Sequence, residues 1–181
     1  MESQEHAKGA AEASESRNPL ISRVTLTIAI LAVAAAVVAS LETTEGDKTI
    51  VSKNDAVLEQ NRATDQWNFY EAKSLKKNIY SLAAEEGGPK AADYAKVAAK
   101  NDADQADIKK QAKAHEDKRD SYSEIADVHE KRHGRLTIAS TLLHMSIAIA
   151  TLAILLGRPW PWLASLILTF VGVGIAVWAY L

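Results

Sequence analysis

Five residues in the second half of the chain match the motif of a zinc-dependent protease. His129-Glu130-Lys131-Arg132-His133 has the pattern H-E-x-x-H, in which two histidines one helical turn apart share a metal ion and the glutamate acts as a general base. Catalytic zinc needs three protein ligands, and the longer form of the motif fails because Leu136 and Ala139 stand where it has glycine and histidine. We interpret the motif as part of a group of basic residues that lies beside a membrane. His129 and His133 stay as weak metal candidates, and no metal or other cofactor is expected.

A second ionisable group lies inside an apolar run. His144 belongs to residues 136–156, which contain no Asp, Glu, Lys or Arg. An ionisable side chain at that depth in a membrane marks a functional site by default. It would line a path for protons or solutes, or it would donate a hydrogen bond to a serine, threonine or carbonyl of a neighbouring helix. One polar residue in three apolar runs makes a poor pore, which favours the hydrogen bond.

The third candidate is a cluster of aromatic residues in an aliphatic-poor stretch. Trp67 and Tyr70 are neighbours on a helix, and Lys73 lies one turn from Phe69, within reach of a cation–π contact. The cluster would pack the two arms of a hairpin together, or it would bind a partner, because Trp and Tyr are frequent interface anchors. The partner-binding candidates are Asp65, Trp67, Phe69, Tyr70 and Lys73.

Composition argues against several classes of function. The chain has no cysteine, so disulfides, thiol catalysis and cysteine-ligated zinc are excluded. Its net charge of −2 gives no basic surface for nucleic acid. We find no Ser/His/Asp arrangement, phosphate-binding glycine loop or paired carboxylates within a membrane run, and we expect no enzymatic activity.

The helices that carry these candidate residues can be predicted because charged residues are strictly segregated along the sequence. Residues 24–41, 136–156 and 163–181 carry no Asp, Glu, Lys or Arg, whereas residues 42–135 hold 17 of the 21 basic and 19 of the 23 acidic side chains. About 20 apolar residues cross a bilayer as a helix. The sequence therefore predicts an all-α membrane protein with three transmembrane helices. We expect residues 1–22 to form a disordered polar tail and residues 157–162 to form an interfacial turn with two tryptophans.

Small residues in the spans predict close helix packing. Ala32, Ala36 and Ala39 share one face of the first span, and Gly172 and Gly174 lie in the third. Small side chains let helix backbones approach each other in lipid.

Residues 42–135 predict a long antiparallel helical hairpin of the coiled-coil type, with its turn at 85–90. Two glycines and a proline there end one helix and start another, and residues 43–46 are expected to loosen the exit from the membrane. The first arm repeats every seven residues in two rows, and the asparagines in one of them can fix register and oligomeric state. These rows are Val51, Leu58, Asp65, Ala72 and Ile79, with Asn54, Asn61, Asn68, Leu75 and Leu82. A row in the second arm comprises Tyr94, Asn101, Ile108, His115, Tyr122 and His129. The two rows of the first arm either form the seam of a coiled coil, where the side chains of two helices meet, or lie on a solvated face.

Several blocks of sequence resemble a known family. They are the leader Glu5-His6, the entry Asn18-Pro19-Leu20, the block Thr64-Asp65-Gln66-Trp67-Asn68-Phe69-Tyr70-Glu71-Ala72-Lys73, the foot His133-Gly134-Arg135 and the run Ile147-Ala148-Ile149-Ala150. Together they resemble domain-of-unknown-function family 4337, small bacterial membrane proteins. The resemblance spans nearly the whole chain and implies three spans with a central helical segment. It implies no activity.

Two functional hypotheses come from these observations. The first is a membrane-anchored scaffold whose hairpin self-associates or binds another membrane protein. The alternative is a small transport or channel component that uses His144, and a zinc protease is a distant third. Arg17 and Arg23 precede the first span and acidic residues follow it, which favours a periplasmic hairpin in a bacterial inner membrane. Lys131, Arg132 and Arg135 beside the second span favour the opposite orientation.

Overall fold

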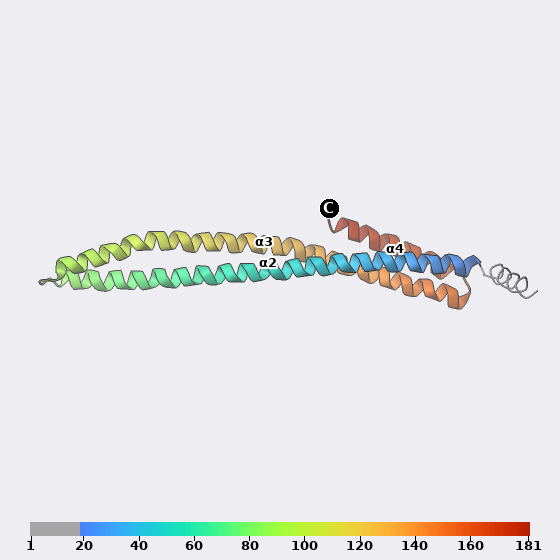
Figure 1. Cartoon of the computed structure of the whole chain (residues 1–181), viewed down its shortest axis with the longest axis horizontal. Coiled ribbons are helices and arrows are strands. Elements are labelled where there is room, and N and C mark those ends of the chain that lie inside the picture. The colour runs from blue at the N-terminus through green and yellow to red at the C-terminus, as the bar shows by residue number, and fades with distance from the viewer. Residues whose placement is uncertain (1–18) are drawn as a thin grey trace, which may run out of the picture. The chain divides into compact units, whose positions relative to one another are not determined.

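The computed structural model describes residues 19–181, which form three α-helices, α2 (Pro19–Glu85), α3 (Ala91–Leu156) and α4 (Trp160–Trp178) (Figure 1). The described residues include no β-strand. Most of the tail expected at residues 1–22 lies outside the described residues. Its last four residues do not belong to a tail, because α2 already begins at Pro19, a residue suited to the first turn of a helix.

The helices divide into two compact units. Among the described residues, one unit contains Pro19–Asp47 together with His129–Leu181, and the other contains Lys48–Val128. We call them the span unit and the hairpin unit. α2 and α3 each contribute a segment to both, and α4 lies wholly in the span unit. The predicted hairpin at 42–135 is therefore longer than the hairpin unit, since Glu42–Asp47 and His129–Arg135 pack with the spans.

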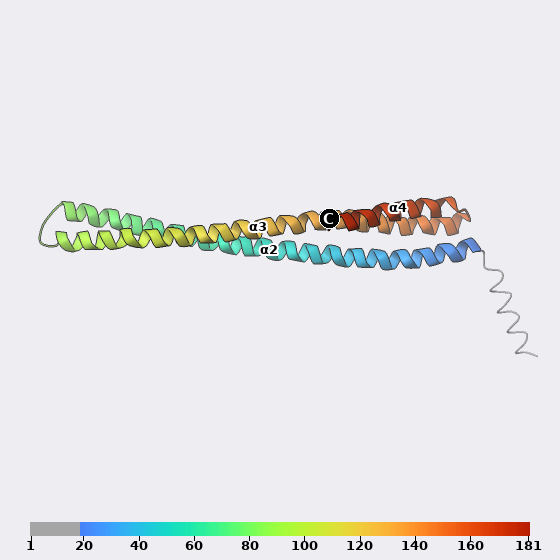
Figure 2. The same cartoon turned by 90° about the horizontal axis from the view of Figure 1, so that it is seen from above.

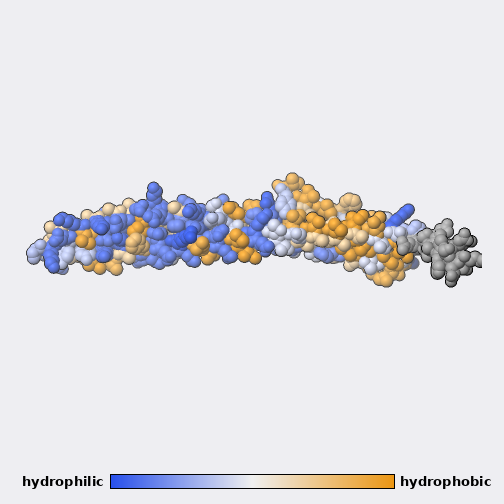
Figure 3. All heavy atoms as spheres, in the orientation of Figure 1, coloured by the Kyte–Doolittle hydropathy of each residue, from blue (hydrophilic) through white to orange (hydrophobic). Residues whose placement is uncertain are grey.

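The span unit has a core of aliphatic and small side chains from all three helix segments. One cluster joins Ala35 and Val38 of α2 to Leu136, Ala139 and Leu143 of α3 and Ala179 beyond α4. A second joins Val24 to Ala150 and Ala153. Figure 3 shows hydrophobic side chains gathered on the surface of this unit. Each of the three helices contains a segment long and apolar enough to cross a membrane.

Small residues pack closely here, although not all of those expected. A Cβ atom on Gly172 would lie 3.3 Å from the Ala139 carbonyl oxygen, so α4 approaches the backbone of α3. Gly174 has no atom of another residue at such a distance. In the first span Ala35 is buried, but Ala32 and Ala36 are exposed. The buried face of α2 instead contains Leu31, Ala35 and Val38. Leucine and valine fill more of the space between the helices than the exposed alanines would.

The expected loosening of the chain at residues 43–46 is wrong. α2 continues through this stretch, and Thr43 and Thr44 donate hydrogen bonds to the carbonyls of Ala39 and Ser40, one turn earlier. A Cβ atom on Gly46 would lie 3.2 Å from Nδ1 of His133. The glycine therefore serves a packing role inside the helix, where it admits an imidazole ring, rather than ending the helix.

The hairpin unit is an antiparallel pair made by α2 and α3, which Figures 1 and 2 both show side by side. The reversal uses Gly87 and Gly88, whose φ angles of 80° and 100° favour glycine. Tyr80, before the turn, packs against Tyr94, after it, with ring centroids 5.7 Å apart. The two tyrosines lie equally far before and after Gly87, so the turn sets the register of the two helices.

Small and polar residues make up the interior of the hairpin. Ala63 and Ala112 are fully buried, and Ser52, Glu59 and Asn101 are nearly so. Asn101 belongs to the predicted seven-residue row of α3, whose members are all buried or half-buried, and Ala112 lies one turn from Ile108 of that row.

On α2 the two predicted rows do not pack against α3 and lie on the exposed face, which was the second of the two interpretations of the sequence. Their residues, including Val51, Leu58, Leu75, Ile79, Leu82 and the three asparagines, are all exposed. The opposite face of α2 meets α3, because its alanines allow the backbones to approach and its polar residues find partners there.

A matched pair of alanines tests this close packing. We expect Ala112→Leu to lower the free energy of unfolding by about 1–3 kcal/mol, because a fully buried alanine leaves no room for three further carbons. Ala114→Leu, two residues away and exposed, should leave it nearly unchanged. Unfolding of the full-length protein in mild detergent, followed by circular dichroism, compares the two variants. Equal stabilities would contradict the packing described above.

Candidate functional site

The aromatic cluster of α2 is divided between the interior and the surface of the hairpin. Trp67 Nε1 donates a hydrogen bond of 2.8 Å to Glu116 of α3, and the Trp67 ring packs edge-on against Tyr70 with centroids 5.6 Å apart. Both rings are half-buried. This part of the cluster therefore closes the hairpin, which was one of the two interpretations of the sequence.

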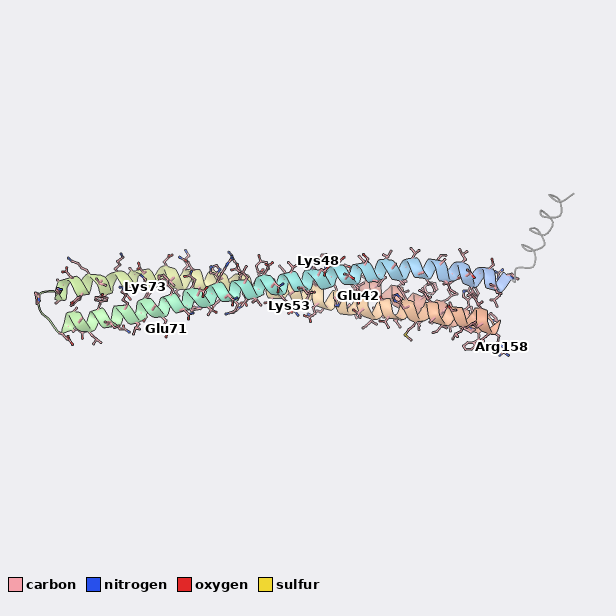
Figure 4. The ribbon with its side chains drawn as sticks, turned by 60° about the horizontal axis from the view of Figure 1, so that its bottom comes forward. Glu42, Lys48, Lys53, Glu71, Lys73 and Arg158 are labelled. Atoms are coloured by element: carbon pink, nitrogen blue, oxygen red, sulfur yellow. The ribbon has the colours of Figure 1, made fainter. Side chains whose placement is uncertain are left out.

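Lys73 also joins the two arms. Its Nζ atom lies 2.7 Å from Oδ2 of Asp104 and 5.3 Å from the centroid of the Phe69 ring. The hydrogen bond from Lys73 lowers the pKa of Asp104 below its ordinary value. Figure 4 shows Lys73 on the side of α2 that faces α3 and Glu71 on the other side. A second ion pair between Lys77 and Asp102, at 2.6 Å, lies one turn further on.

The remaining two candidates of the cluster face outward. Phe69 is 51% exposed, and Asp65 is exposed as well. Phe69 borders a shallow groove between the two arms, whose floor includes Ile108 of α3. Of the five predicted partner-binding residues, Asp65 and Phe69 are the ones with a largely free surface.

The two histidines of the H-E-x-x-H motif serve as hydrogen-bond partners of α2 in the span unit. His129 Nδ1 lies 2.6 Å from Oε2 of Glu45, whose side chain is 3% exposed. His133 Nδ1 donates to the Glu42 carbonyl at 3.0 Å, and Thr137 donates to the Glu42 carboxylate at 2.7 Å. Within residues 19–181 no three His, Cys, Asp or Glu side chains form a group that could hold a metal ion.

A second buried Glu–His pair lies inside the hairpin unit and was missed by sequence reasoning. Glu59 Oε2 lies 2.6 Å from His115 Nδ1, and the Glu59 side chain is 7% exposed. Each pair, Glu45 with His129 and Glu59 with His115, lies equally far before and after Gly87. Counting residues outward from the turn would have predicted both pairs, but the two glutamates belong to neither of the first-arm rows seen in the sequence.

His144 lies on the surface of the span unit. Its Nδ1 atom donates to the Ser140 carbonyl at 2.8 Å, within α3 itself. The expected hydrogen bond to a neighbouring helix is therefore replaced by one along the same helix. The side chain is exposed and does not point into the core of the unit.

The aromatic residues near the ends of α4 are tied to the other helices. Arg135 stacks on Trp178 at 4.3 Å from the ring centroid and donates to its carbonyl, while Arg132 lies over Tyr180 at 5.3 Å. At the other end Trp162 Nε1 donates to the hydroxyl of Thr27. Aromatic residues at both ends of a span are typical of membrane–water interfaces.

The Glu59–His115 pair predicts a dependence of hairpin stability on pH. The hydrogen bond with His115 lowers the pKa of Glu59 below its ordinary value of 4.5, helped by Arg62 and opposed by burial. A carboxyl group with a lowered pKa in the folded state stabilises that state above its ordinary pKa, and the contribution is lost as the pH falls through the lowered value. We expect the melting temperature to fall below about pH 4.5.

Thermal unfolding at a series of pH values from 7 to 3 measures this effect. Glu59→Gln should flatten the acid limb of the profile, and Glu124→Gln, at an exposed position, is the control. An acid limb that is the same in wild type and Glu59→Gln would show that the pair does not act as described.

Comparison with known proteins agrees with the family resemblance noted in the sequence. A family model described as "Domain of unknown function (DUF4337)" matches residues 20–181. No curated protein and no solved structure matches the chain. Because the matched region covers all but the first residues, the chain belongs to the DUF4337 family.

Proposed function

We propose that this protein is a membrane-anchored scaffold, which spans the bilayer three times and uses its hairpin to bind other protein chains, including copies of itself. Three helices with spanning length and apolarity support the anchor. Large apolar side chains cover the outside of the span unit, among them Leu26, Val33 and Phe170. Such a surface is stable in contact with lipid, whereas water would make it a site of aggregation.

The observation that carries the scaffold proposal is an apolar surface on the hairpin unit, where lipid contact is not expected. Leu58 is 47% exposed and Leu75 62% exposed, and Val51, Ile79 and Leu82 are exposed to a similar degree. They lie in the most charged part of the chain. Several large apolar side chains that share one exposed face of a helix mark a protein-interaction surface. Trp67 and Tyr70 are already engaged within the hairpin, so they add stability rather than contact area.

We place the protein in a bacterial inner membrane with the hairpin in the periplasm. Arg17 and Arg23 before the first span support this orientation, since the first span usually dominates. Arg132 and Arg135 beside the second span favour the opposite orientation, but both of these side chains are stacked on aromatic rings. A transport role has less support, because His144 is an exposed side chain bonded to its own helix. A zinc protease has less still, because the paired histidines bond to Glu45 and Glu42.

Labelling of single cysteines tests the membrane topology, since the natural chain has no cysteine. We expect a membrane-impermeant maleimide added to intact cells or spheroplasts to label Ser121→Cys in the hairpin. It should not label Arg158→Cys, between the second and third spans, until the membrane is permeabilised. The reverse pattern would invert the orientation. Equal labelling at both sites in intact membranes would overturn the three-span anchor.

The mass of the full-length protein in lipid nanodiscs or gentle detergent tests self-association. We expect a defined oligomer for wild type and a monomer for the double variant Leu58→Ser/Leu75→Ser, which makes the exposed apolar surface polar. Ile125→Ser/Val128→Ser is the matched control, because these residues of α3 are exposed to a similar degree, 43% and 48%, and lie on the other arm.

Two further results bear on the same proposal. Trp67→Ala should lower the unfolding temperature of the hairpin and leave the oligomer intact, because Trp67 bonds to Glu116 within one chain. A wild-type protein that is monomeric at all concentrations tested, with no protein co-purifying from its native membrane, would overturn the scaffold proposal.

A further inference from the structure

We infer that the outer face of α2 pairs with the same face of a second copy, in parallel and in register. The inference rests on the proposed self-association and assigns its surface, partner and orientation. We call this face the outer row. It consists of Val51, Asn54, Leu58, Asn61, Asp65, Asn68, Ala72, Leu75, Ile79 and Leu82, all of which are exposed.

The spacing of the outer row is that of a helix seam without a partner in its own chain. Its members alternate three and four residues apart from Val51 to Leu82, which is more than four heptads. Three to four heptads with apolar seam positions indicate a coiled coil, and six of the ten positions here are apolar, with three asparagines and Asp65 among them. The hairpin uses the opposite face of α2, where Ala56 and Ala63 are buried against α3. α2 therefore has two packing faces, of which the chain itself fills one.

Three asparagines point to an identical chain as the partner. Asn54, Asn61 and Asn68 occupy successive positions in one of the two rows of the seam. An amide has both donor and acceptor groups, so each asparagine can pair with its own copy across a two-fold axis. A purely apolar partner would bury three amides without hydrogen bonds, which is unfavourable. Asparagines inside a seam also fix its register.

Charged residues beside the seam favour the parallel orientation. In a parallel pair of helices, a residue flanking one side of the seam meets the residue five positions later on the partner. Glu71 and Lys76 have this spacing and opposite charges, so a parallel dimer forms the pair twice. Tethering also favours the parallel orientation, because the first span holds the same end of the hairpin part of α2 near the membrane in both copies.

One residue of the outer row opposes the pairing. Asp65 would meet Asp65 of the second copy, and like charges placed together across an interface are unfavourable. The dimer should therefore be weaker than an uninterrupted seam of this length would give. Asp65→Asn removes the repulsion and adds a further amide pair, so it should lower the dissociation constant several-fold.

Disulfide crosslinking in proteoliposomes tests the surface and its register. The natural chain has no cysteine, so each variant of the full-length protein carries one. Asn54→Cys, Asn61→Cys and Leu82→Cys should each give a disulfide-linked dimer on mild oxidation, because facing positions in a parallel seam lie within disulfide range at both ends of the row. Ile125→Cys, on the exposed side of α3, should remain unlinked at the same protein-to-lipid ratio.

The outcomes separate this inference from the scaffold proposal. A defined oligomer with crosslinks at Ile125→Cys, or with none at Asn54→Cys and Leu82→Cys, would overturn the outer row as the parallel surface while self-association stands. A further variant, Asn68→Cys, lies near the middle of the outer row, and a crosslink there alone would indicate an antiparallel pair and overturn the orientation. A monomer in every variant, Asp65→Asn included, would overturn this inference together with the proposed self-association, and the scaffold proposal would then depend on a different protein as the partner.

Discussion

Two buried carboxylates set the strongest constraint on this structure. A glutamate removed from water is costly unless a partner compensates its charge and its hydrogen bonds. Glu45 in the span unit and Glu59 in the hairpin unit each lie 2.6 Å from a histidine of α3. A shift of α2 against α3 by one residue within either unit would leave a carboxylate without this partner. The pairs therefore fix the register of the two helices and contribute less to the free energy of helix association.

Small side chains make this constraint possible. Ala63 and Ala112 in the hairpin unit and Gly46 and Gly172 in the span unit are places where backbones or rings come close. The interior of the hairpin unit is thin, so it contains few large apolar side chains. Leucines, isoleucines and valines that would fill a wider core lie on the outside instead. Their exposure in the span unit suits lipid, and their exposure in the hairpin unit suits another protein chain.

The same argument explains why the motifs that suggested chemistry have structural roles here. The histidines of the H-E-x-x-H pattern hold Glu45 and the Glu42 carbonyl, and Trp67 holds Glu116. In each case a long polar or aromatic side chain reaches from one helix to the other across a narrow gap. The spacing that resembles a metal site arises because residues one turn apart on α3 face the same side of α2.

The sequence by itself determined the helical class, the positions of the three apolar segments and the reversal around Gly87. These depend on local composition, on the length of apolar runs and on glycine and proline, all of which act within a few residues. It also indicated which face of α3 is turned inward, because only one row on that arm repeats clearly. The tertiary structure decided which face of α2 meets it. Both seven-residue rows in the hairpin part of α2 lie outside, because the opposite face offers the alanines and charged residues that fit α3, such as Ala56, Glu59 and Ala63. That choice depends on residues about 50 to 90 positions away in the sequence, such as the partners of Trp67 and Glu45, and a local pattern carries no information about them.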